Sequence, residues 1–137
     1  MGELSKNIDN GERFGSAILK NLKLEFNFHL HNLLADGIRD TIKTIDEDGY
    51  IFRAILVLLP KGKSIPKHID TGESLTIPRR IHIAVQTNPN CFFNVGDVTK
   101  NLKEGEIWEI DNSGQRHAVS NEGDTDRIHL IVDFLKK

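Results

Sequence analysis

Hydrophobic and polar side chains alternate along much of this chain, which is the pattern of half-buried β-strands. The alternation is clearest in residues 22–30 and 79–87. Residues 50–59 are instead almost continuously apolar, which predicts a strand that is buried on both faces and central in its sheet. Residues 12–21 carry apolar side chains four positions apart and predict a short helical segment near the N-terminus.

Shorter apolar runs between clusters of Gly, Pro, Asn and Asp predict the remaining strands. These runs are residues 91–95, 106–110, 116–120 and 127–135. Seven or eight short strands with near-regular turns are typical of an all-β sandwich or barrel, and a jelly roll is the architecture that we expect. The sequence thus predicts a single domain over residues 1–137, with a motif-bearing core at about 50–134 and a loosely ordered start at 1–11.

Turn lengths also indicate which strands are neighbours. Residues 91–95 should pair back on residues 79–87 as a hairpin, because the turn between them is short. Arg127 should begin a strand that is antiparallel to the strand starting near His117, since one turn separates the two. Residues 71–78 contain two chain breakers and should form a loop beside His68. This loop could close over a substrate.

Composition narrows the classes of function. The chain has 137 residues, of which 38% are hydrophobic and 28% charged, as is ordinary for one soluble globular domain. Its net charge of −2, without a basic stripe, argues against a nucleic-acid-binding protein. The longest apolar run, residues 54–59, is too short to span a bilayer, and no apolar signal core is visible. The single cysteine, Cys91, allows no intrachain disulfide, so we expect a cytoplasmic protein without a membrane partner.

The triplet His68-Ile69-Asp70 is the first candidate for chemistry. Residues two apart in an extended chain point to the same face, so this imidazole and this carboxylate could hold one ion from a single strand end. His117, at the start of a distant predicted strand, is the candidate third ligand. Two imidazoles and one carboxylate with open positions are the ligand set of non-haem Fe(II) oxygenases. The alternative is an exposed loop pair and an unrelated strand-edge histidine.

Arg127 is the second candidate. Along its predicted strand, Ile128, Leu130 and later apolar residues line one face, while Arg127 and His129 lie on the other. An arginine in an otherwise apolar strand is costly to bury unless an anion meets it, and a planar guanidinium suits a carboxylate. The sequence therefore predicts an anion-binding role for Arg127. The alternative is a rim ion pair with Asp126 or Glu122.

Arg80 and His82 form a further polar pair on the predicted inward face of an apolar strand. They are candidates for ligand binding by the same reasoning. Arg80 could also mark a solvated strand start, and His82 could be a core histidine that a backbone carbonyl satisfies. His29 and His31 lie in a Phe-rich stretch, and packing explains them better than metal binding does.

The order of these motifs resembles the aspartyl/asparaginyl β-hydroxylase family. The resemblance covers roughly residues 50–134 and follows the motifs in sequence: His68-x-Asp70, Arg80-Ile81-His82-Ile83, Gly105-Glu106-x-Trp108, His117-x-x-x-Asn121 and Arg127-Ile128-His129-Leu130-x-x-Asp133. It implies a cupin-like double-stranded β-helix that uses Fe(II) and 2-oxoglutarate. It further implies that His68, Asp70 and His117 hold iron, that Arg127 pairs with the distal carboxylate of 2-oxoglutarate, and that Arg80 and His82 lie near the cosubstrate or substrate. No catalytic side chain beyond the metal site is implied.

One departure bears on the substrate. The animal peptidyl hydroxylases of this family have glycine at the position of Asp70, and the complete triad here is closer to the bacterial amino-acid hydroxylases. A free amino acid, a peptide side chain and another small metabolite all remain open as substrates, with O2 as co-reactant, and an oligomer is possible. Residues 105–121 also resemble the second motif of cupins. A general cupin that binds a metal or small ligand without using 2-oxoglutarate is therefore the alternative function.

Overall fold

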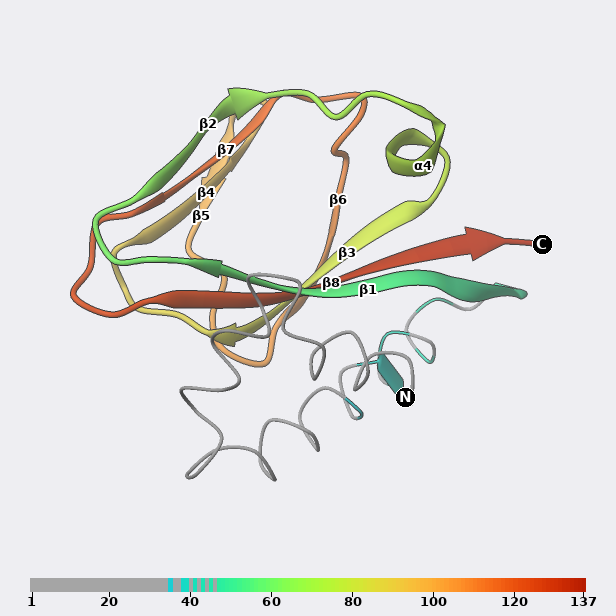
Figure 1. Cartoon of the computed structure of the whole chain (residues 1–137), viewed down its shortest axis with the longest axis horizontal. Coiled ribbons are helices and arrows are strands. Elements are labelled where there is room, and N and C mark those ends of the chain that lie inside the picture. Colours follow the sequence, from blue (N-terminus) through green and yellow to red (C-terminus); the bar gives the residue numbers. More distant parts are fainter. Residues whose placement is uncertain (1–34, 36–37, 40, 42, 44, 46) are drawn as a thin grey trace, which may run out of the picture.

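The computed structural model describes residues 35, 38, 39, 41, 43, 45 and 47–137, and within them the chain forms two four-stranded antiparallel sheets (Figure 1). One sheet has the strand order β1-β8-β3-β6 and the other the order β2-β7-β4-β5. The elements are β1 (Gly49–Leu59), β2 (Ser64–His68), α4 (Glu73–Thr76), β3 (Arg79–Gln86), β4 (Cys91–Val95), β5 (Val98–Lys100), β6 (Ile107–Ile110), β7 (His117–Asn121) and β8 (Arg127–Lys136).

The prediction of an all-β double-stranded β-helix is confirmed by this arrangement. The predicted helix at 12–21, the predicted strand at 22–30 and the start at 1–11 lie outside the described residues. The expected loop at 71–78 contains the four-residue helix α4, and the short strand β5 was not predicted. Among the described residues, no helix has the length and apolar character needed to cross a membrane.

Two predicted strand pairings are wrong. β4 pairs with β5 and β7 rather than with β3, and β8 pairs with β1 and β3 rather than with β7. In both cases the short connection carries the chain from one sheet to the other instead of folding it back in a hairpin. Each sheet must bury one face against the other sheet, and turn residues alone do not distinguish a hairpin from such a crossing.

The prediction that β1 is a central strand is also wrong for the part of the chain that the structure describes, where β1 lies at the edge of its sheet and β8 is central. Tyr50 and Phe52, near the start of β1, are 51% and 46% exposed. The apolar run of β1 is explained by a second buried face. Residues Ile38 and Ile45 pack with the outer side of the sheet in a hydrophobic cluster that includes Leu56.

Strand β8 divides the molecule into an apolar side and a polar side. Ile128, Leu130, Val132 and Phe134 belong to the outer hydrophobic cluster. The alternate positions of β8, which face the space between the two sheets, are Arg127, His129, Ile131 and Asp133. All eight of these residues are buried, although three of the inner four carry polar or charged groups. A second apolar cluster fills part of the space between the sheets, and the remainder is a cavity.

Candidate active site

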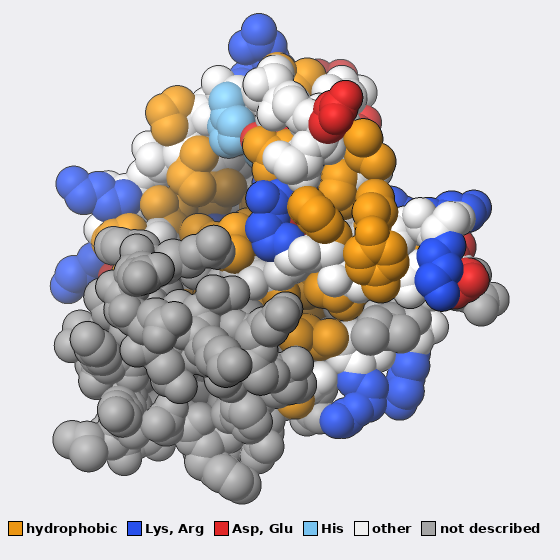
Figure 2. Space-filling view, turned by 45° about the vertical axis from the view of Figure 1, so that its right-hand side comes forward, with side chains coloured by type: hydrophobic (Ala, Val, Ile, Leu, Met, Phe, Trp, Pro, Cys, Tyr) orange, Lys and Arg blue, Asp and Glu red, His pale blue; other side chains and the backbone are white. Residues whose placement is uncertain are grey.

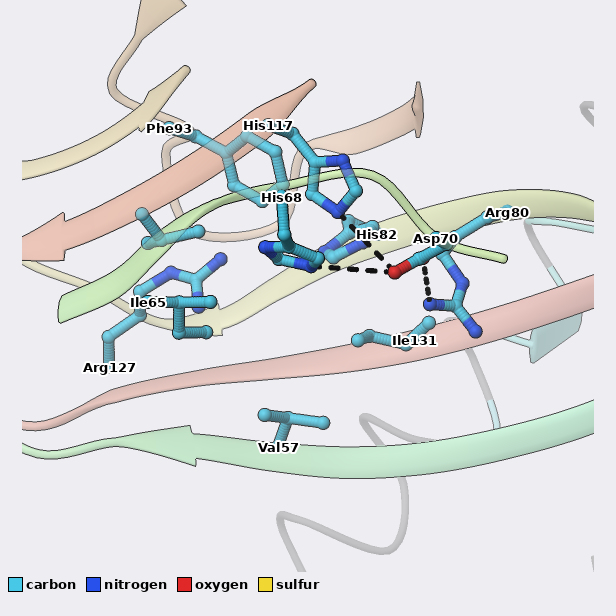
Figure 3. Close-up of a pocket in the computed structure, with 11 residues that line it drawn as sticks. Val57, Ile65, His68, Asp70, Arg80, His82, Phe93, His117, Arg127 and Ile131 are labelled. Carbon is cyan, nitrogen blue, oxygen red and sulfur yellow. Dashed lines mark hydrogen bonds and ion pairs between the residues drawn. The ribbon is translucent and has the colours of Figure 1, made fainter. Parts of the chain in front are cut away.

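A cavity of about 180 Å³ lies between the two sheets (Figure 3). It is lined by all six residues that the sequence analysis proposed as metal ligands or ligand-binding residues. One sheet contributes Arg80 and His82 from β3 and Arg127 from β8; the other contributes His68 at the end of β2 and His117 on β7. The remaining lining residues are Val57, Ile65, Asp70, Phe93, Val119 and Ile131. Figure 2 shows a face of the molecule on which histidine, hydrophobic and basic side chains lie next to each other at the surface.

His68, Asp70 and His117 lie close enough together to hold one metal ion. Each offers one ligand atom, and these atoms lie within 4.8 Å of one another. Nε2 of His68 is 3.4 Å and Nε2 of His117 is 3.9 Å from Oδ1 of Asp70 (Figure 3). The side chain of His68 is 41% exposed, whereas those of Asp70 and His117 are 11% and 9% exposed, so the cluster opens to solvent on the His68 side.

The backbone of β2 brings His68 into this cluster by a bulge. Ile65 lies opposite Val119 in β7, but His68 lies opposite His117, so the β2 strand holds one residue more than β7 between these two pairs. The extra residue falls at Pro66 and Lys67. Proline donates no ladder hydrogen bond and is tolerated at such a bulge on an edge strand. The shift turns His68 to the same face as His117.

Both histidines are held in the tautomer that a metal ligand requires. Nδ1 of His68 lies 2.8 Å from the carbonyl oxygen of Pro66, and Nδ1 of His117 lies 3.3 Å from that of Gln115. A carbonyl oxygen only accepts, so in each ring Nδ1 carries the proton and donates it. In the neutral ring the lone pair is then on Nε2, the atom that faces Asp70, and backbone carbonyls fix the ring orientation, as they do for many metal-bound histidines.

The carboxylate of Asp70 is oriented through its other oxygen. Oδ2 accepts hydrogen bonds from Nη1 of Arg80 at 3.0 Å and from Nδ2 of Asn112 at 2.9 Å. The backbone N–H of Asp70 donates to the carbonyl oxygen of Asn112. Asn112 also donates to the carbonyl oxygen of Leu75 in α4. Oδ1 of Asp70 therefore remains turned to the two histidines, and this donor set fits a divalent metal ion.

Arg80 reaches the cavity, but its guanidinium already contacts two carboxylates. Besides Asp70, it donates from Nε and Nη2 to the two oxygens of Asp133, both at 2.9 Å. Burial is the largest single influence on the pKa of Arg80 and lowers it, but the two carboxylates together raise it by more, so the pKa lies above its ordinary value. The prediction that Arg80 contacts a cosubstrate stays a prediction, and its observed contacts are those of a residue that orients Asp70.

Arg127 is buried without a negatively charged partner. It is 3% exposed, and no carboxylate among the described residues lies within ion-pair distance of it. The predicted alternative, an ion pair with Asp126, is not found; Oδ1 of Asp126 accepts from the backbone N–H of Lys61. Burial lowers the pKa of Arg127 to about 10, and the guanidinium lies 5.5 Å from the centre of the Phe93 ring. Such a cation favours an anion from outside the chain.

A pair of neutral histidines lies next to Arg127. Nη2 of Arg127 donates to Nδ1 of His129 at 2.8 Å, so this nitrogen is an acceptor and the His129 proton is on Nε2, which is buried without a partner. Nδ1 of His82, 3.3 Å from the same nitrogen, must then carry a proton. Burial, followed by the charge of Arg127, holds the pKa of both histidines well below the usual range. Neither ring neutralises or repels an anion by its own charge.

The sequence analysis assigned no role to four residues that contact this site: Arg53, Asn112, His129 and Asp133. His129 and Asp133 could have been found, because both lie on the same strand face as Arg127 in the alternating pattern of β8. Asn112 had only a turn signal. Arg53 is the only charged residue in the apolar run of residues 50–59, but a bulge in β1 decides which way it points.

A comparison with models of protein families finds a match that spans all the elements of this site. The model of the family described as aspartyl/asparaginyl beta-hydroxylase matches residues 31–137, which include every residue named above. The chain belongs to this family. The β-hydroxylase match thus confirms the resemblance read from the motifs. None of the curated protein sequences matches the chain.

Solved structures similar to this β-hydroxylase family member include several cupins. A predicted oxalate decarboxylase from Thermotoga maritima is 24% identical, with 62% of this chain and 67% of that chain covered and a TM-score of 0.49. An RmlC-like cupin with a double-stranded β-helix from Methanocaldococcus jannaschii is 15% identical, with 67% and 84% covered and a TM-score of 0.47. A cupin 2 conserved barrel protein from Salinispora arenicola is 14% identical, with 64% and 74% covered and a TM-score of 0.45.

Proposed function

We propose that this protein is an Fe(II)- and 2-oxoglutarate-dependent dioxygenase that hydroxylates an amino acid or an aspartyl- or asparaginyl-type side chain. The overall reaction joins substrate, O2 and 2-oxoglutarate and yields hydroxylated substrate, succinate and CO2. One observation carries the proposal: a single cavity holds both a His-Asp-His ligand cluster and a buried arginine, Arg127, that has no anion among the described residues. Membership of the β-hydroxylase family supports it.

His68, Asp70 and His117 would hold the metal through Nε2, Oδ1 and Nε2, the atoms that their other contacts leave free. Three protein ligands leave the remaining coordination positions open. Fe(II), when bound there, would supply these positions and the redox chemistry that oxidises 2-oxoglutarate. The backbone carbonyls of Pro66 and Gln115 keep Nδ1 of both imidazoles occupied, and Arg80 and Asn112 keep the carboxylate turned toward Nε2.

Arg127 would bind the distal carboxylate of 2-oxoglutarate. Its burial makes this interaction strong, since a charge-assisted hydrogen bond weakens less where water is excluded. The walls nearby, Val57, Ile65 and Ile131, are apolar and would exclude water from the bound carbon chain. The predicted contact of His82 with the cosubstrate is part of this proposal, and His82 would act there as a neutral ring.

Purified protein incubated anaerobically with Fe(II) should bind 2-oxoglutarate, and addition of O2 and ascorbate should release succinate. Succinate release measured with free amino acids, and then with peptides containing Asp or Asn, would indicate the substrate. An Arg127→Gln variant should keep the metal and lose 2-oxoglutarate, while Arg79→Gln, a matched change at an exposed arginine, should alter neither. Absence of both metal and 2-oxoglutarate binding would contradict the proposal. Metal binding without 2-oxoglutarate binding would favour the general cupin instead.

A further inference from the structure

We propose that Asp133 is a positioning residue for the metal ligand Asp70 and that it acts through Arg80. This inference rests on the proposed metal centre. Asp133 lies on β8 with 1% exposure and does not line the cavity, so it is not a ligand itself. A buried carboxylate in a strand interior needs compensation, and here the compensation connects directly to the metal site.

Three neighbouring strands place Arg53, Asp133 and Arg80 in one row across the sheet. Asp133 in β8 lies opposite Arg53 in β1 on one side and opposite Arg80 in β3 on the other. Residues directly opposite each other share a face of the sheet. A register shift in β1 places Arg53 opposite Asp133, whereas regular pairing from Ile51 onward would place Phe52 there. The chain therefore departs from a regular strand at the position that brings this cation to Asp133.

The hydrogen bonds in this row determine how Arg80 meets Asp70. Asp133 accepts two hydrogen bonds from Arg53, at 2.8 and 2.5 Å, and two from Arg80, both at 2.9 Å. Arg80 is thereby held by a two-point contact that fixes the plane of its guanidinium. Only Nη1 is left for Asp70, and it donates to Oδ2 at 3.0 Å. Asp133 thus limits Arg80 to one oxygen of Asp70 and leaves the other for the metal.

Charge leads to the same conclusion as geometry. Two arginines, Arg53 and Arg80, face two carboxylates, Asp133 and Asp70, in a connected row that carries no net charge before a metal binds. If Asp133 loses its charge, an uncompensated cation remains next to Asp70. That cation would repel a divalent ion, and Arg80 would be free to take both oxygens of Asp70.

The test measures affinity for Co(II) by its visible absorption, which also reports the ligands around the ion. Asp133→Asn, which keeps the side-chain shape, should weaken Co(II) binding by about 10- to 100-fold, as is common for a lost contact to a metal ligand. Asp133→Glu should recover most of this loss. Glu109→Gln is the matched control. Glu109 is one of two carboxylate partners of Arg79, the neighbour of Arg80 on β3, and it has no contact to Asp70.

Arg53→Gln provides a second test, because its expected effect on Co(II) affinity is one that a merely structural role of this row would not produce. Arg53 also donates to the carbonyl oxygen of Ser74 at 3.1 Å, a contact at the exposed end of its side chain that does not involve Asp70. Removing this positive charge should leave Co(II) affinity unchanged or raise it a few-fold, opposite in sign to Asp133→Asn. If Asp133→Asn does not fold, the Arg53→Gln result still tests the network, and weakened binding there would overturn it.

Two outcomes separate this inference from the proposed function. If the unaltered protein binds no Co(II) or Fe(II), the proposed metal centre itself fails. If the unaltered protein binds metal, but Asp133→Asn binds it with the same affinity and spectrum and is only less stable, the positioning role of Asp133 is wrong while the metal centre stands.

Discussion

His68 and His117 lie directly opposite each other on the inner face of one sheet, with ring centroids 4.2 Å apart, because strand β2 contains one extra residue before His68. Regular pairing from Ile65 onward would instead put Lys67 opposite His117 and turn His68 to solvent. The metal cluster therefore depends on a local irregularity of the backbone as much as on the identity of its ligands.

Inserting one alanine after Lys67 should turn His68 away from the cavity. β2 is an exposed edge strand, so the fold should tolerate the insertion. We expect metal affinity to fall at least about 100-fold, since a direct ligand is lost and even an indirect contact can cost that much. Isothermal titration with Mn(II) measures this change. An alanine inserted after Asp97, in the exposed turn between β4 and β5, is the control and should leave the affinity unaltered.

Replacing Arg127 by methionine should separate binding from stability. Loss of a buried charge-assisted contact to a carboxylate costs at least about 2 kcal/mol, so affinity for 2-oxoglutarate should fall about 30-fold or more. The free energy of unfolding without ligand should stay equal or rise by about 1 kcal/mol, because a buried cation that lacks an anion is replaced by an apolar side chain. Urea unfolding and ligand titration check the two parts. A less stable protein that still binds 2-oxoglutarate normally would contradict the role assigned to Arg127.

The two buried histidines predict that the protein loses stability in mild acid. His82 and His129 have pKa values far below 6.5 in the folded protein, chiefly because they are buried, while the unfolded chain takes up their protons near pH 6.5. Stability is therefore fully present above pH 6.5 and falls as the pH drops below it. Each histidine should contribute a slope of about 1.4 kcal/mol per pH unit. In His129→Asn, whose side-chain oxygen can replace Nδ1 as the acceptor for Arg127, one histidine's slope should disappear. Urea unfolding of metal-free protein between pH 7 and 5 measures it, and equal slopes would refute the assignment.

Asn121 should be important for stability rather than for chemistry. Its side chain is buried and donates to the carbonyl oxygens of Leu59 and Thr125, while Oδ1 accepts from Asn88 and from the backbone of Gly123. Asn121→Ala leaves several buried groups without partners and should cost about 2 to 4 kcal/mol. The neighbouring Ser120→Ala, at a less buried position, should change stability by less than about 0.5 kcal/mol. Metal affinity of the folded Asn121→Ala protein should be unaltered.

Most strands were predictable here, and strand pairing was not. The alternation of β3 and the apolar run of β1 follow from which faces are buried, and burial leaves a direct trace in the sequence. Pairing of β4 with β7, and of β8 with β1, joins residues far apart in the chain. Nothing in a turn of a few residues records whether it closes a hairpin or crosses to the opposite sheet.

The sequence by itself determined the types of group that the site contains: two imidazoles, a carboxylate and an arginine, in an order that matches one family. Only the tertiary structure decided what each group is free to do. Arg80 and Arg127 both line the same cavity, yet one is paired with Asp70 and Asp133 and the other has no carboxylate partner among the described residues. The reason is physical. Whether a charged side chain can bind a ligand depends on whether it already pairs with another residue of the chain. The strand registers, set by single extra residues in β1 and β2, decide which side chains pair.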